Sequence, residues 1–167
     1  MRFSTFALAA LAAASLAGSA SAAPAKSDHD QIVALENGFT AAFNAKDIGK
    51  IMSCYAKQGL FVFDVTPPRQ YVGWEAYRKD WQGLFKQFSG PAKMAISDLH
   101  VDVVGPVAWG HSIQDVTLSD AKGGKNHIVV RVTDVYRKFG GQWRIVQEHV
   151  SVPVDLDTGK ADTLSKP

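Results

Sequence analysis

The chain lacks the residue patterns that commonly hold metals and cofactors. Its only cysteine, Cys54, cannot form an intramolecular disulfide, and its apolar neighbours favour a small buried side chain over a reactive thiol. The five histidines show neither the H-x-x-x-H nor the H-E-x-x-H spacing of a zinc site. No G-x-S-x-G elbow and no phosphate-binding glycine loop is present. We therefore expect no metal and no cofactor.

An excess of charge of one sign is also lacking. The sequence has 18 Lys and Arg residues against 16 Asp and Glu residues, and the two kinds are interspersed along the chain. This distribution provides neither the basic stripe of a nucleic-acid-binding domain nor a polybasic cluster for a lipid surface. We expect no nucleic-acid partner and no stable membrane anchoring.

Long apolar runs are absent except near the N-terminus. There, Arg2 precedes an apolar stretch over residues 6–16, and Ala20-Ser21-Ala22 follows as a small-residue cleavage pattern. The stretch is shorter than the roughly 20 residues of a membrane-spanning helix. Residues 1–22 are therefore predicted to be a secretory signal peptide, which makes the mature protein secreted or periplasmic. The remaining chain, about 145 residues, has the length of one domain.

Three helices are predicted in the first half of the chain. Ser27 has the position of an N-cap, and apolar residues at helical spacing continue the first helix over 28–45. A short second helix is expected over 48–55, and a third begins after Gly73 and ends before Pro91. One face of the third helix carries an aromatic stripe, which is more typical of a core than of a cofactor site: Trp74, Tyr77, Trp81, Leu84, Phe85 and Phe88.

The second half of the chain changes to the two-residue period of β-strands. One strand is expected earlier, over 59–65, and four more over 93–104, 107–118, 126–139 and 142–152. The connections between the last four strands are short and contain glycine, so neighbouring strands should be antiparallel. The expected fold is α+β, with a cone-shaped, curved antiparallel sheet wrapped around three N-terminal helices.

Alternation along the last two strands points to a candidate site. Arg131 and Thr133 share one face of their strand, while Trp143, Gln147 and His149 share one face of the next. If the Trp143 set faces the aromatic helix, Gln147 and His149 enter the cone, and Arg131 comes within reach across the sheet.

A buried guanidinium needs an anionic partner, either on a ligand or on a protein carboxylate such as Asp64. The alternatives are a solvent-facing Arg131, a structural His149, and an Asp64 that serves only as a turn residue next to Pro67-Pro68.

The C-terminal pattern resembles a known family. Arg131-Val132-Thr133, Tyr136-Arg137-Lys138, a glycine turn, Trp143-Arg144-Ile145 and His149-x-Ser-x-Pro153 occur in the order typical of the SnoaL-like branch of the nuclear transport factor 2-like superfamily. That superfamily includes ketosteroid isomerase and the association domain of calcium/calmodulin-dependent protein kinase. The resemblance implies a SnoaL-like domain over residues 23–154 with a C-terminal tail over 155–167, a pocket inside the cone, and a homodimer.

Two functional hypotheses follow from these observations. The first is an exported protein that binds a small anionic or carbonyl-bearing molecule and has acid–base activity of the isomerase or dehydratase type. His149 and Asp64 would be catalytic, and the ligand would contact Arg131, Thr133, Gln147, Trp74, Tyr77, Trp81 and Trp143. The second is a non-catalytic dimerisation or scaffold module with a residual pocket. A third possibility is that the aromatic stripe fills the cone and leaves no cavity.

Overall fold

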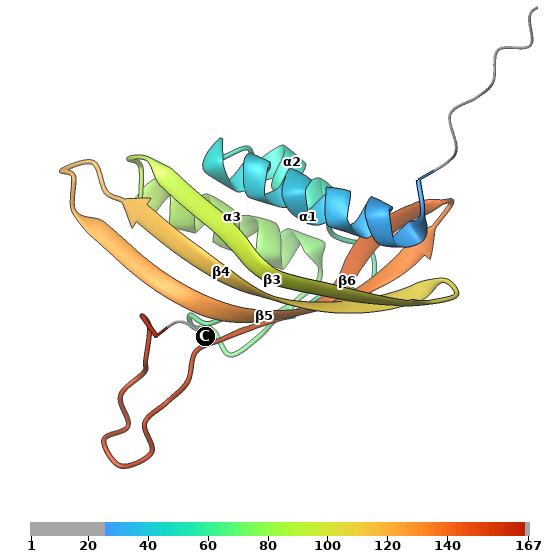
Figure 1. Cartoon of the computed structure of the whole chain (residues 1–167). Coiled ribbons are helices and arrows are strands. Elements are labelled where there is room, and N and C mark those ends of the chain that lie inside the picture. The colour runs from blue at the N-terminus through green and yellow to red at the C-terminus, as the bar shows by residue number, and fades with distance from the viewer. Residues whose placement is uncertain (1–25, 166–167) are drawn as a thin grey trace, which may run out of the picture.

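Three helices cover one face of a curved sheet (Figure 1). The protein is described by a computed structural model, in which residues 26–165 are placed. The helices are α1 (Asp28–Asn44), α2 (Ile48–Ser53) and α3 (Trp74–Gln87). The strands are β1 (Phe61–Phe63), β2 (Tyr71–Val72), β3 (Ala92–Val104), β4 (Val107–Ser119), β5 (Lys125–Phe139) and β6 (Gln142–Ser151). The α+β architecture predicted from the sequence is confirmed.

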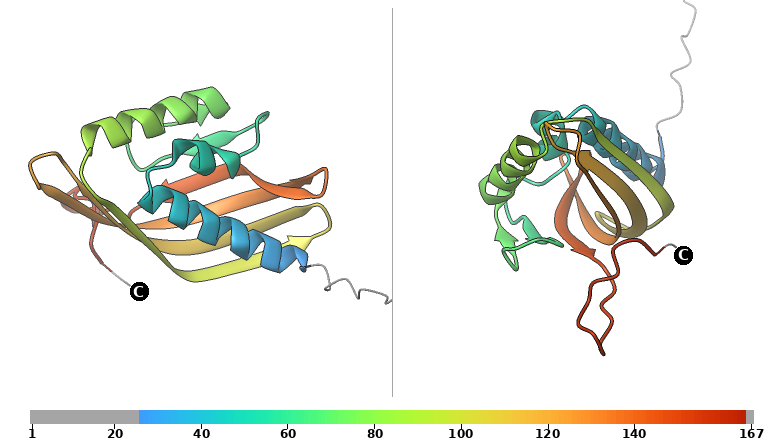
Figure 2. Two further views of the ribbon diagram at one scale, coloured as in Figure 1. Left: turned by 90° about the horizontal axis from the view of Figure 1, so that it is seen from above. Right: turned by 90° about the vertical axis from the view of Figure 1, so that its left-hand side faces the viewer.

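The sheet is mixed and remains open. Its strand order is β2-β1-β6-β5-β4-β3, and every neighbouring pair is antiparallel except β1 with β6. The antiparallel pairing predicted from the sequence is confirmed for the last four strands, and the one parallel pair joins β6 to the short strand β1. Figure 2 shows the sheet curling around the helices without closing into a barrel. We call the face covered by the helices the inner face and the opposite face the outer face.

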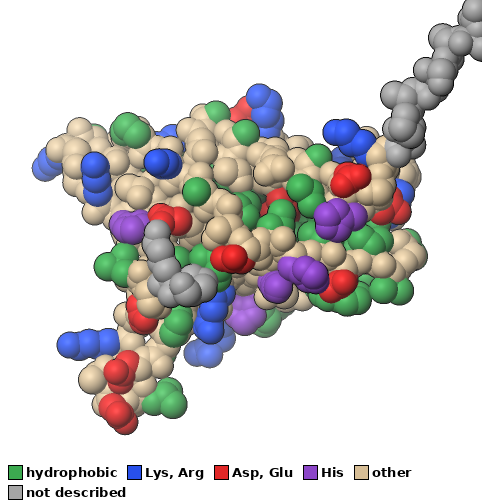
Figure 3. Space-filling view, in the orientation of Figure 1, with side chains coloured by type: hydrophobic (Ala, Val, Ile, Leu, Met, Phe, Trp, Pro, Cys, Tyr) green, Lys and Arg blue, Asp and Glu red, His purple; other side chains and the backbone are tan. Residues whose placement is uncertain are grey.

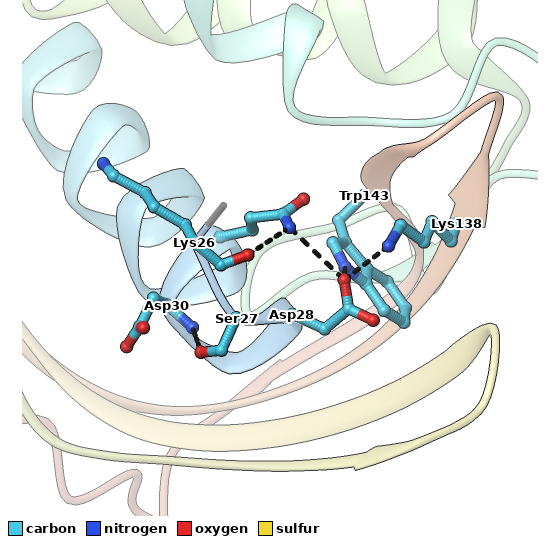
Figure 4. Close-up of polar contacts among 7 residues, drawn as sticks. Lys26, Ser27, Asp28, Asp30, Lys138 and Trp143 are labelled. Carbon is cyan, nitrogen blue, oxygen red and sulfur yellow. Dashed lines mark hydrogen bonds and ion pairs between the residues drawn. The ribbon is translucent and has the colours of Figure 1, made fainter. Parts of the chain in front are cut away.

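The start of α1 is tied to the turn between β5 and β6 (Figure 4). Ser27 caps the helix as predicted, because its hydroxyl accepts a hydrogen bond from the Asp30 amide at 3.1 Å. The carboxylate of Asp28 accepts a hydrogen bond from the Trp143 indole at 3.1 Å and also binds the ammonium of Lys138. These contacts fix the position of the first helix on the sheet.

A β-bulge interrupts the pairing of β5 with β6. Tyr136 lies opposite Ile145, whereas Val135 lies opposite Gln147, so Val146 is an extra residue in β6. An extra residue shifts the alternation of side chains by one position. As a result, Glu148 lies on the inner face together with Ile145, and the residues on either side of Glu148 lie on the outer face.

The C-terminal segment folds back toward the sheet. Val154 forms a bridge with Ala161, and the carbonyl of Thr163 accepts a hydrogen bond from the Val129 amide at 2.7 Å. Figure 3 shows acidic side chains gathered on this projecting turn. Within residues 26–165, no helix has the length and apolar character needed to cross a membrane. The predicted signal peptide over residues 1–22 lies outside the described part of the chain.

Candidate functional site

A cavity of about 520 Å³ lies between α3, the end of α1 and the inner face of the sheet. Aromatic and aliphatic side chains form most of its wall, including Phe39, Phe43, Trp81, Leu84, Phe88, Met94, Val116, Leu118, Ile128 and Val130. Edge-to-face packing of Trp81 with Phe39 and Phe43, at ring-centroid distances of 6.0 and 5.9 Å, makes this wall rigid. The aromatic stripe therefore leaves a hollow instead of filling the cone.

Glu148 is the buried acid on the wall of this cavity. Only 4% of its surface is exposed. The hydroxyl of Tyr55 donates to its Oε2 at 2.8 Å, and the hydroxyl of Tyr77 donates to its Oε1 at 2.6 Å. Burial raises the pKa of Glu148 to about 7, although both hydrogen bonds act in the opposite direction. Near neutral pH this carboxyl can therefore both accept and release a proton.

Asp64 is linked to Glu148 through Tyr77. It follows β1, two residues after the buried Val62, and therefore points to the inner face. Its Oδ2 lies 3.3 Å from the Tyr77 hydroxyl. A phenol has one hydrogen, which the shorter contact assigns to Glu148, so the longer contact is a hydrogen bond when Asp64 is protonated and donates. Burial raises the pKa of Asp64, which favours that protonated form.

Two further carboxyls lie deeper, behind Glu148. Asp134 is paired directly across the sheet with Glu148, and the hydroxyl of Tyr136 donates to Glu36 at 2.9 Å. Glu36 and Asp134 are 2% and 4% exposed, and Oδ1 of Asp134 has no hydrogen-bond partner among the described residues. Burial raises the pKa of Glu36 to about 7 and that of Asp134 well above its usual range. Adjacent carboxyls in a dry interior cannot all be ionised, so this group retains protons near neutral pH.

Three of the predicted site residues meet at the cavity. Asp64, Tyr77 and Trp81 all contribute to its wall. Tyr77 and Trp81 lie one turn apart on α3, so both face the sheet, as the aromatic spacing predicted.

Four other predicted residues lie on the outer face. Arg131, Thr133 and His149 are exposed, and Gln147 is half-buried. The prediction that Gln147 and His149 enter the cone is wrong, because the bulge at Val146 moves both to the opposite face. Across the sheet, Val132 and Asp134 occupy the inner face of β5, which leaves the side chains of Arg131 and Thr133 outside. The aromatic ring nearest His149 is Phe63, at a centroid distance of 5.5 Å.

The two remaining predicted residues have structural contacts away from the cavity. Trp74 donates its indole hydrogen to the Met52 carbonyl at 2.8 Å, and the ammonium of Lys57 lies 3.0 Å from its ring centroid. Trp143 is 3% exposed and binds Asp28 at the start of α1. It lines a separate hollow of about 430 Å³ between the helices and the turn of β5 and β6.

The sequence analysis did not identify Glu148, Glu36 or Asp134 as site residues. For two of them the sequence does contain a signal, an acidic residue within an apolar pattern. Glu36 interrupts the apolar stripe of α1, and Asp134 stands among the alternating apolar residues of β5. Glu148 gives no comparable signal, because its inward orientation depends on the bulge.

The residues lining the cavity fit an organic ligand better than an ion. None of the described lining residues is Lys, Arg or His. Within residues 26–165, no three histidine, cysteine or acidic side chains are grouped closely enough to hold a metal ion. The polar groups on the wall of the hollow are carboxyls, amides, a phenol, a hydroxyl and an indole, which form hydrogen bonds with neutral oxygen atoms.

The fold and this site define an α+β protein with an open, curved sheet and an apolar cavity that carries paired acids. The chain belongs to the family of SnoaL-like domains, whose pattern matches residues 32–155. The family suggested by the sequence is therefore confirmed. No curated protein matches the chain.

Among the solved structures that share the fold are the following three. A nuclear transport factor 2-like protein of unknown function from Pseudomonas putida KT2440 is 29% identical, with a TM-score of 0.74 over 83% of this chain and 95% of that one. A protein from Xanthomonas campestris, provisionally named a calcium/calmodulin-dependent protein kinase II association domain, is 23% identical, with a TM-score of 0.65 over 78% and 91%. A protein from Novosphingobium aromaticivorans DSM 12444, provisionally named a scytalone dehydratase, is 16% identical, with a TM-score of 0.67 over 74% and 82%.

Proposed function

We propose that the protein binds a small, uncharged molecule with a carbonyl or hydroxyl oxygen and catalyses proton transfer on it. The observation that carries this proposal is the hydrogen-bonded chain Asp64–Tyr77–Glu148 on the wall of an otherwise apolar cavity. Two acids held in different environments are a recurring arrangement for general acid–base catalysis. An anionic ligand is disfavoured, because the cation once expected to hold it, Arg131, lies on the outer face.

The two carboxyls divide the roles. Glu148, whose anionic form is stabilised by two phenol hydrogen bonds, removes a proton from a carbon next to a carbonyl group. Asp64, whose neutral form is favoured by burial, donates its proton to the carbonyl oxygen, so that an enol forms and charge is conserved. The same pair can remove water from a hydroxy compound if Asp64 protonates the departing hydroxyl. The provisional name of the neighbour from Novosphingobium refers to a dehydratase, which is consistent with this chemistry but shows only the fold.

The test uses 2-tetralone, an uncharged two-ring ketone, as a probe. In deuterated buffer at pH 7.5, wild-type protein should accelerate exchange of the hydrogens next to the carbonyl, followed by proton NMR. Glu148→Gln should reduce the acceleration by about 10²- to 10⁴-fold, because it removes the base. Asp64→Asn should also reduce the rate.

Glu75→Gln is the control, because Glu75 is an exposed acid on α3 that does not line the cavity. This variant should keep most of the activity. Exchange that is unaffected by Glu148→Gln would contradict the proposal.

A scaffold role is the alternative, and exposed aromatic side chains on the sheet favour it. Phe63 and Trp109 are 37% and 47% exposed. On this reading a homodimer forms through the sheet and the cavity has no substrate. A monomeric mass by light scattering would remove this alternative. Secretion or periplasmic localisation remains part of the proposal and rests on the N-terminal pattern over residues 1–22.

A further inference from the structure

Gln114 is a buried polar residue on the cavity wall that the acid–base chemistry does not use. It lies on the inner face of β4, is 6% exposed, and lines the cavity. None of the hydrogen bonds made by residues 26–165 involves its side-chain amide. Buried amides are normally paired, because each has two donor hydrogens and an acceptor oxygen that water would otherwise satisfy. A group inside the cavity is the available partner.

A second unpaired donor lies on the helical wall of the same cavity. The indole of Trp81 is 7% exposed, and its Nε1 has no hydrogen-bond partner among the described residues. Trp81 follows Tyr77 by one helical turn, and both side chains line the hollow. The cavity therefore carries polar groups beyond the Asp64–Tyr77–Glu148 chain.

Strand register sets the separation of these groups. Gln114 pairs with Val130 on β5, whereas Glu148 pairs with Asp134. Val130 and Asp134 are four residues apart, which is about 13 Å along a strand. One small polar group cannot reach both positions, so a ligand that contacts both must be elongated.

We propose that the ligand is a two-ended, uncharged molecule with an apolar body. Its reacting oxygen lies near Asp64 and the adjacent carbon near Glu148, and a second oxygen pairs with the amide of Gln114 and the indole of Trp81. Gln114 is then a specificity-determining residue that selects ligands with polar groups at both ends. This inference rests on the proposed function, because it places the reacting end of the ligand at Glu148.

The test compares two probes that share a two-ring body, 2-naphthol and naphthalene-2,6-diol, by isothermal titration calorimetry. Wild-type protein should bind the diol about tenfold more tightly than the mono-ol, which is the value of one good hydrogen bond. Gln114→Met keeps the side-chain length but removes the amide, so it should bind both probes with similar affinity. Gln87→Met is the matched control, because Gln87 is exposed at the rim of the same cavity. It should keep the tenfold preference.

The possible outcomes separate this inference from the proposed function. If wild-type protein binds both probes equally, the second polar site is wrong while the cavity remains a binding site. If neither probe binds, the proposed function fails and the inference fails with it. Should Gln114→Met not fold, 6-methoxy-2-naphthol tests the site in the wild-type protein. This probe keeps an acceptor oxygen at the second end and should retain tighter binding than 2-naphthol, because Trp81 offers only a donor.

Discussion

At the scale of single residues, the unusual feature is a buried carboxyl, Glu148, that accepts two phenol hydrogen bonds. Glu148 receives two phenol hydrogen bonds, which favour its charged form, while burial favours its neutral form. The outcome is a pKa of about 7, so burial has the larger effect. Removal of either phenol should tip this balance further toward the neutral form.

Tyr77→Phe should raise the pKa of Glu148 above its wild-type value. A hydrogen bond to a charged group contributes about 1.5–3 kcal/mol, which corresponds to an increase of roughly one to two pH units. The measurement is NMR titration of protein labelled with ¹³C at the glutamate side-chain carboxyl. The chain has only three glutamates, at positions 36, 75 and 148, so Glu148→Gln assigns the signal.

Two further variants test whether the phenol hydrogen bonds cause this increase in pKa. Tyr55→Phe should give a similar increase, because Tyr55 is the other donor to Glu148. Tyr71→Phe is the control, since its hydroxyl binds Asp80 and not Glu148. An unchanged titration in both Tyr55→Phe and Tyr77→Phe would show that the phenols do not hold the carboxylate.

At the scale of elements, the attachment of α1 to the turn of β5 and β6 is separate from the cavity. Trp143→Phe removes the hydrogen bond to Asp28 but keeps an aromatic ring in the core. We expect faster amide hydrogen exchange in the first turn of α1, with no change in naphthol affinity, because Trp143 does not line the cavity. Mass spectrometry of peptides covering residues 26–34 measures this exchange.

Trp81→Phe is the complementary control, because it should affect ligand affinity and not hydrogen exchange in α1. Trp81 lines the cavity on α3 and makes no contact with Asp28. This variant should change naphthol affinity and leave exchange at the start of α1 unaltered. If Trp143→Phe weakened naphthol binding while α1 exchange stayed the same, Trp143 would belong to the ligand site after all.

Elements were more predictable from the sequence than the site. Helical caps, glycine turns and hydrophobic period depend on residues close in the chain, so three helices and four long strands lie within a few residues of their predicted bounds. The two-residue strand β2 lacks enough residues to produce a pattern, and the parallel pairing of β1 with β6 depends on contacts distant in sequence.

The prediction of the site residues on β6 failed because of one feature that the sequence does not reveal, the β-bulge at Val146. Strict alternation from Trp143 places Gln147 and His149 inside, and one extra residue at Val146 reverses that assignment. Asp64, Tyr77 and Trp81 were found because strand and helix geometry near them is regular. Glu148 was missed because its orientation depends on the bulge.

At the scale of the whole molecule, the buried acids make folding depend on proton uptake. Glu36 and Glu148 have pKa values of about 7 in the folded protein, compared with 4.5 as ordinary values. Between these values, the folded state holds more protons than the unfolded state. The free energy of unfolding therefore decreases as pH rises, by about 1.4 kcal/mol per pH unit for each extra proton.

The raised pKa of Asp134 adds to this decrease. The half-buried carboxyls Asp28 and Asp47 have lowered pKa values, so their effect on stability lies below about pH 4 and outside this window. Wild-type protein should thus be more stable to urea at pH 5 than at pH 8.

Glu36→Gln should weaken the dependence of the free energy of unfolding on pH. The amide oxygen can still accept the hydrogen bond from Tyr136, so the variant removes the titrating proton and keeps the contact. Urea unfolding at several pH values between 5 and 8 should show a smaller loss of stability than in wild type, and a more stable protein at pH 8. Glu75→Gln is the control, because Glu75 is exposed on α3 and should leave the curve unchanged. A wild-type stability that stays constant or increases from pH 5 to pH 8 would mean that the interior acids are not protonated in the folded state.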